Sequence, residues 1–159
     1  MKKRKAYKPK QVNPEAWKVA VMGQCKLSQY DQDKFSESVK LAVDNVAKAC
    51  ASKADWQAIF DVANMLDTFS TMPKVMKDAT DYVRGLQSTI EAILNRQKAK
   101  NTRALYAQEL AALREMVDLW VEVLQWVTMA EYLQCQEKTH DRIVKALRSN
   151  KNAIVVEAP

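Results

Sequence analysis

The sequence predicts an all-α fold, a bundle of five or six helices with a long C-terminal helical hairpin. The 159 residues include only two glycines and four prolines, so architectures that depend on tight turns are disfavoured. Apolar residues also recur at spacings of three and four, as they do on one face of an amphipathic helix. A chain of this length can bury a core of its own, and we expect one helical domain over residues 13–150.

Capping signals predict where the first two helices begin. Asn13-Pro14 is typical of a helix start, because asparagine caps and proline suits the first helical position. This short helix is expected to end near Met22. Ser28 begins a second helix, with Asp31 in the acidic position of a capping box. Its apolar stripe continues to about residue 50.

The next two helices follow from the same kind of signal. Ser52 and Asp55 predict a third helix, whose apolar face runs from Trp56 to Phe69. Pro73 is expected to end that helix and to begin a fourth. The fourth helix runs to a polar, basic segment at residues 95–102, the best candidate for a linker.

Residues 103–150 contain neither glycine nor proline. One apolar seam runs from Tyr106 to Val127 with coiled-coil-like spacing, and a second stripe runs beside it to Leu133. Two stripes indicate a helix that is covered on more than one side. Either this helix lies at the centre of the bundle, or one stripe faces a second copy, so monomer and homodimer both stay open. Thr139 is expected to cap a final helix, which completes the hairpin.

The positive charge is concentrated at the N-terminus. The net charge is +6, and the first ten residues alone carry six basic side chains. Lysine repulsion and Pro9 oppose regular structure, so residues 1–12 are expected to form a disordered basic arm, and residues 151–159 a C-terminal tail. The arm is compatible with a solubilising tail, a nuclear-import signal or a nucleic-acid contact.

Further basic segments lie near residues 96–103 and 142–148, and Tyr7 could stack on a base. Together with the arm they form the predicted nucleic-acid-binding set. It comprises Lys2, Lys3, Arg4, Lys5, Tyr7, Lys8, Lys10, Arg96, Lys98, Lys100, Arg103, Arg142, Lys145 and Arg148.

Acidic side chains are grouped elsewhere. Residues 55–67 carry aspartates at regular intervals with no basic residue among them, and residues 104–137 sum to a charge of −5. We expect these acids to form helix faces that meet a basic partner. The predicted partner-binding set is Asp55, Asp61, Asp67, Glu115, Asp118 and Glu122.

Signatures of catalysis and cofactor binding are missing. His140 is the only histidine, its neighbours are typical of a surface helix, and the three cysteines have no metal-ligand spacing. Two glycines cannot build a phosphate-binding loop. We therefore expect no enzyme activity, no cofactor and no metal. Charges interrupt the most apolar window, Met116–Cys135, so we expect a cytoplasmic protein with no membrane contact.

Several segments together resemble small helical proteins encoded by phages, prophages and plasmids of Gram-negative bacteria. The segments are K-K-R-K-A-Y-K-P-K at the start, N-P-x-A at 13–16, D-W-x-x-I-F-D-x-x-N-x-L at 55–66, I-L-N-R-Q at 93–97 and E-L-A-A-L-R-E at 109–115. This family has no assigned activity, so the resemblance implies no functional residues. It implies a bacterial host and a class of mobile-element proteins that block host defences, including anti-CRISPR proteins.

These observations predict a non-enzymatic phage or mobile-element protein that binds a host protein or ribonucleoprotein. It would inhibit or modulate a nucleic-acid-handling complex such as a CRISPR effector. The alternative is a protein that binds DNA or RNA directly through the basic arm and the basic helix faces.

Overall fold

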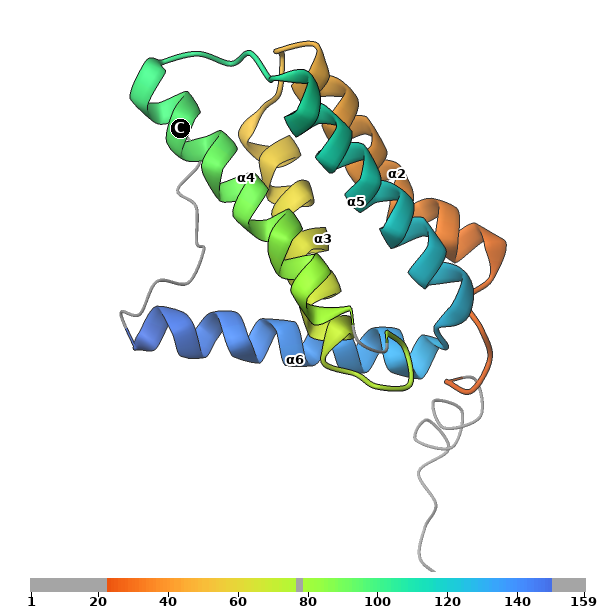
Figure 1. Cartoon of the computed structure of the whole chain (residues 1–159). Coiled ribbons are helices and arrows are strands. Elements are labelled where there is room, and N and C mark those ends of the chain that lie inside the picture. Colours follow the sequence, from red (N-terminus) through yellow and green to blue (C-terminus); the bar gives the residue numbers. More distant parts are fainter. Residues whose placement is uncertain (1–22, 77–78, 150–159) are drawn as a thin grey trace, which may run out of the picture.

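The computed structural model describes residues 23–76 and 79–149, and within them the fold is all-helical. Four helices lie side by side as a bundle, and the last helix runs across one end of it (Figure 1). The helices are α2 (Gln29–Ala47), α3 (Lys53–Ser70), α4 (Thr80–Lys100), α5 (Ala107–Trp126) and α6 (Met129–Arg148). The all-α prediction is confirmed. The expected helix over 13–22, the arm at 1–12 and the tail at 151–159 lie outside the described residues.

The predicted caps of α2 and α3 are confirmed. The Ser28 hydroxyl accepts a hydrogen bond from the Asp31 backbone N–H at 3.2 Å. The Ser52 hydroxyl accepts one from the Asp55 N–H at 3.2 Å, and the Asp55 carboxylate accepts one from the Ser52 N–H at 2.7 Å. This reciprocal pair satisfies N–H groups that a helix start otherwise leaves free.

Trp120 of α5 lies at the centre of the core. Its side chain is 1% exposed, and its indole N–H donates to the Phe35 carbonyl of α2 at 3.1 Å. The ring packs near Phe69 of α3 and Tyr132 of α6. The predicted seam on α5 is therefore internal from Leu113 to Val127, whereas Trp126 and Leu133 of the second stripe are exposed.

Helix α4 begins later than the sequence predicts. Pro73 lies in a turn, and the helix starts at Thr80. In that turn the Val75 N–H donates to the Met72 carbonyl at 2.9 Å, and Met72 and Met76 are both buried. Burial of these two methionines in the core keeps this segment in a turn. A helix that began at Pro73 would require the turn to straighten.

The C-terminal hairpin is not confirmed, because α6 crosses the end of the bundle and packs against α3. The chain turns at Val127, which is extended, and Thr128 with Glu131 forms the capping box that begins α6. The prediction that Thr139 caps the last helix is wrong, since Thr139 lies buried in the middle of α6. The Ser/Thr-x-x-Glu signal that begins α6 occurs eleven residues earlier in the sequence, at Thr128.

The segment before α2 holds this corner in place. The Met129 N–H donates to the Cys25 carbonyl at 3.0 Å, and the Ala130 N–H donates to the Gly23 carbonyl at 2.9 Å. The first N–H groups of α6 are therefore already satisfied. None of the helices in residues 23–76 and 79–149 is long and apolar enough to cross a membrane.

Candidate functional site

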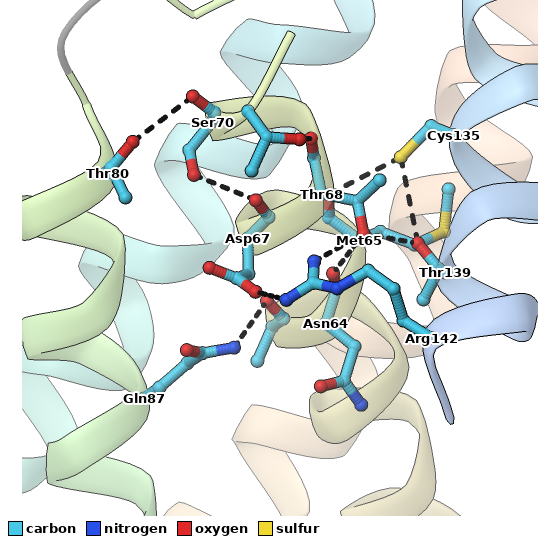
Figure 2. Close-up of polar contacts among 12 residues, drawn as sticks. Asn64, Met65, Asp67, Thr68, Ser70, Thr80, Gln87, Cys135, Thr139 and Arg142 are labelled. Atoms are coloured by element: carbon cyan, nitrogen blue, oxygen red, sulfur yellow. Dashed lines mark hydrogen bonds and ion pairs between the residues drawn. The ribbon is translucent and has the colours of Figure 1, made fainter. Parts of the chain in front are cut away.

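Asp67 belongs to a polar network between α3 and α6 (Figure 2). Its carboxylate forms an ion pair with Arg142, whose guanidinium also donates to the Thr68 hydroxyl at 3.0 Å. The Thr68 hydroxyl accepts a second hydrogen bond from Thr139 at 2.8 Å. Asp67 is 8% exposed. It therefore joins two helices and has little surface left for a partner.

The acidic face expected on α3 needs correction. Asp61 is exposed, but Asp55 is half-buried in the capping box, and the Asn45 amide donates to its carboxylate at 3.0 Å. Asp67 is buried against Arg142. The three acids are six residues apart, and since a helix turns about 100° per residue, they point in different directions. They do not form one surface.

The acids of α5 do lie on the surface. Glu115, Asp118 and Glu122 are all exposed and lie along one side of the helix. Glu115 accepts a hydrogen bond from the Tyr82 hydroxyl of α4. Desolvation, together with this hydrogen bond and the Glu115 charge, raises the pKa of Tyr82 to about 12. Asp118 and Glu122 have no ion-pair partner among the described residues.

Two of the predicted basic residues are engaged in structural contacts. Arg96 pairs with Glu109, its side chain is 14% exposed, and its guanidinium lies 4.2 Å from the centre of the Tyr106 ring. Arg142 pairs with Asp67. Lys98, Lys100, Arg103, Lys145 and Arg148 are exposed. The basic residues of the arm lie outside the described part of the chain.

A cleft of about 330 Å³ lies where the α2–α3 connection meets the α4–α5 connection. Both connections place a residue in the left-handed region there, Ala49 with φ 57° and Asn101 with φ 45°. Ala49 ends α2 as in a Schellman motif, since its N–H donates to Val46 and the Cys50 N–H donates to Asn45, both at 3.0 Å. These two sharp helix ends leave room for the cleft between them.

The cleft is bordered by three basic side chains, Lys53, Lys98 and Arg103. Trp56, which is 5% exposed, lines it beside them. The remaining lining residues are polar or small, and the described residues around the cleft contribute no acid to its wall. They are Val46, Ala49, Ala51, Ser52, Gln97, Asn101 and Thr102.

The charge of this cleft suits a phosphate-bearing ligand. Each of its basic side chains can neutralise one phosphate through a charge-assisted hydrogen bond. Arg96, another basic residue near the end of α4, does not line the cleft and is paired with Glu109. The cleft is therefore a positively charged hollow between helix ends.

The sequence predicted Lys98 and Arg103 but missed Lys53 and Trp56. Lys53 follows the Ser52 cap directly, in a segment whose pattern indicates only an acidic face. A cap predicts where a helix begins, not which distant loop lies opposite. Only packing of α3 against α4 and α2 brings Lys53 near Lys98.

Comparisons with known proteins leave the family open. The chain matches no protein-family model, no curated protein and no solved structure. Among residues 23–76 and 79–149, no group of three or more His, Cys, Asp or Glu is placed to hold a metal ion. The resemblance to phage-encoded proteins stays a prediction.

Proposed function

We propose that this protein is a non-enzymatic binding protein that contacts nucleic acid directly, and that the cleft bordered by Lys53, Lys98 and Arg103 is one of its contacts. The supporting observation is that three cations, from the start of α3, the last turn of α4 and the α4–α5 connection, meet around a cleft lined by no acid. Lysine and arginine bind the nucleic-acid backbone by releasing condensed counterions. The basic residues of the arm, from Lys2 to Lys10, would add further phosphate contacts.

Charge reversal in the cleft tests the proposal. We expect Lys53→Glu, Lys98→Glu and Arg103→Glu together to weaken binding of a fluorescent oligonucleotide, measured by anisotropy, by at least about tenfold. The slope of log affinity against log salt should fall by roughly 0.7–0.9 for each phosphate that the variant no longer neutralises. Deleting residues 2–10 should reduce the same slope independently.

The matched control carries the same change of charge at exposed lysines outside the cleft, Lys34→Glu, Lys40→Glu and Lys138→Glu. It should bind more tightly than the cleft variant. Equal losses in the two triple variants would show that net charge alone matters, and would contradict the assignment of the cleft. Thermal unfolding of each variant checks that the fold is kept.

A second candidate function is supported by the acids of α5. Asp118 and Glu122 are exposed on one side of the helix, one turn apart, and the exposed Trp126 follows them. Acidic residues beside an aromatic anchor are suited to docking on a basic protein surface. We infer that this side would engage the target if the protein inhibits a host nucleic-acid-handling complex, as the resemblance to anti-defence proteins implies.

The two functions differ in their response to mutation. In a host with CRISPR immunity, an inhibitor should raise the plating efficiency of a targeted phage. Asp118→Lys with Glu122→Lys should abolish that effect, while Glu37→Lys with Glu91→Lys, also exposed, should not. Full protection by the α5 variant would rule out this side as the docking surface.

A further inference from the structure

Tyr106 is an exposed aromatic residue in the connection that also carries Arg103 of the cleft. It precedes α5, and it is 55% exposed although its ring packs against the Arg96 guanidinium at 4.2 Å. Arg96 is itself held in place, because it pairs with Glu109 and donates to the Ala104 carbonyl at 3.0 Å. One part of the ring is thus supported from within the protein, and the rest is open to solvent.

Tyr106 lies in one of the two connections that border the cleft. Arg103 lines the cleft, and Tyr106 follows three residues later in the non-helical segment between α4 and α5. Three residues span at most about 11 Å, so the two Cα atoms lie within that distance. A strand that leaves the cleft at Arg103 and follows this connection would therefore reach Tyr106.

We infer that the cleft and Tyr106 together bind single-stranded nucleic acid, with backbone phosphates at Lys53, Lys98 and Arg103 and an unpaired base stacked on Tyr106. This inference rests on the proposed nucleic-acid-binding function and specifies its substrate class. A basic groove beside an aromatic platform is the arrangement that proteins use for single strands. In a duplex the bases are already stacked on one another, so an aromatic ring outside the helix finds no free base to stack on. Only the phosphate contacts of the basic side chains remain.

Arg96 has a positioning role in this arrangement. Its guanidinium supports the ring from the inner side, which limits the movement of the tyrosine before a base binds. The Tyr106 backbone N–H donates to the Glu109 carboxylate at 2.7 Å, independently of the phenol ring. Substituting the side chain therefore leaves this hydrogen bond at the start of α5 in place.

The test measures anisotropy with three labelled probes of equal length, a DNA strand, an RNA strand and a DNA duplex, at one salt concentration. We expect both single strands to bind more tightly than the duplex. Tyr106→Ala should weaken single-strand binding by about 5- to 150-fold, the usual effect of removing one stacking ring. Tyr106→Phe should bind like the wild type, because phenylalanine keeps the stacking face.

The control variant is Tyr30→Ala, which removes another exposed tyrosine, 74% exposed on α2. It should bind each probe as the wild type does. A probe strand without bases should lose the dependence on Tyr106 and keep the dependence on Lys53, Lys98 and Arg103. This abasic probe separates stacking from a general loss of charge or structure.

The possible outcomes separate the inference from the function on which it rests. No binding to any probe would overturn both. Equal binding of strand and duplex, or unchanged binding by Tyr106→Ala, would overturn the single-strand inference alone. A preference for one of the two single strands would support the inference and identify whether RNA or DNA is the ligand.

Discussion

The basic side chains of this protein are of two kinds, those paired with an acid in the fold and those exposed at the cleft. Arg96 pairs with Glu109 of α5 and Arg142 with Asp67 of α3, so each arginine joins two helices. Lys98 and Arg103 border the cleft. Counting charges along the sequence treats all four alike, yet only exposed and unpaired cations are available to a phosphate. Arg96 and Arg142 are structural because the acids that they pair with, Glu109 and Asp67, are largely buried.

The Arg142–Asp67 pair gives an asymmetric mutational prediction. We expect Arg142→Ala to lower the free energy of unfolding by about 1–3 kcal/mol, because it leaves a buried carboxylate unpaired. Asp67→Ala should lower it less, since the Arg142 side chain is 52% exposed and water can solvate it. Urea denaturation measures both. Lys145→Ala, on the exposed side of α6, should change stability by less than about 0.5 kcal/mol. A larger loss from Asp67→Ala would contradict this account.

The cysteines give a second prediction at this scale. Burial raises the pKa of the Cys135 thiol to about 11, against the smaller, opposing effects of Thr139, Lys138 and Arg142. Only the thiolate is nucleophilic. In the native protein at pH 8, a chromogenic disulfide reagent should therefore modify the exposed Cys25 and Cys50 but not Cys135.

The thiol count tests this prediction directly. Adding a denaturant should release the third thiol. In the double variant Cys25→Ser/Cys50→Ser, the native protein should show no rapid reaction. Rapid modification of all three thiols in the native wild type would mean that α6 opens readily from α3.

At the scale of elements, capping side chains set where most of the helices begin. Ser28, Ser52 and Thr128 each accept a hydrogen bond from the N–H three residues later. The cap at Thr128 explains how a stretch without glycine or proline can still turn sharply between α5 and α6. The segment before α2 supports this turn, because the carbonyls of Cys25 and Gly23 accept hydrogen bonds from the first two N–H groups of α6, those of Met129 and Ala130.

The capping box of α3 predicts a pH dependence. Hydrogen bonds from Ser52, and a further one from Asn45, lower the pKa of Asp55 below its usual 3.8. A lowered pKa adds stability that is present above the unfolded-state value and is lost as the pH falls through the folded-state value. Asp55→Asn should therefore be less stable than the wild type at pH 6, and the difference should shrink below about pH 4.

Urea denaturation at pH 6 and at pH 2.5 measures this difference. The control is Asp61→Asn, because the exposed Asp61 carboxylate accepts only the Gln57 amide, at 2.8 Å, and caps nothing. It should be close to the wild type at both pH values. A gap between wild type and Asp55→Asn that stays constant with pH would show that the cap acts through its hydrogen bonds alone, without its charge.

At the scale of the whole molecule, Trp120 connects the helices around one core. Its ring contacts Phe69 of α3 and Tyr132 of α6, and its N–H bonds to Phe35 of α2. Removing a buried tryptophan costs about 3–5 kcal/mol. That is a large share of the roughly 5–15 kcal/mol that stabilises a typical domain.

We therefore expect Trp120→Ala to lower the melting temperature strongly or to prevent folding, as calorimetry or circular dichroism would show. Trp126→Ala is the matched control. Trp126 is 64% exposed, and the Lys26 ammonium lies 4.6 Å from the centre of its ring. Its loss should cost about 1 kcal/mol or less. Similar melting temperatures for the two variants would contradict the central position of Trp120.

Much of the fold could be predicted because its signals are local. The Ser28 and Ser52 caps and the apolar stripes of α2 and α3 lie within a few residues of the structure that they specify. The start of α4 and the direction of α6 could not be predicted in this way. Burial of Met72 and Met76 delays α4, and contacts with α3 turn α6 across the bundle.

The sequence by itself determined the helical class, the caps of α2 and α3 and the separation of positive from negative segments, since propensity, capping and charge are properties of neighbouring residues. The tertiary structure alone decided that Asp67 is buried, that Arg96 and Arg142 are structural, and that Lys53 joins Lys98 and Arg103 around one cleft. Burial and pairing depend on residues that are distant in the chain, and only the packing of helices brings those residues together.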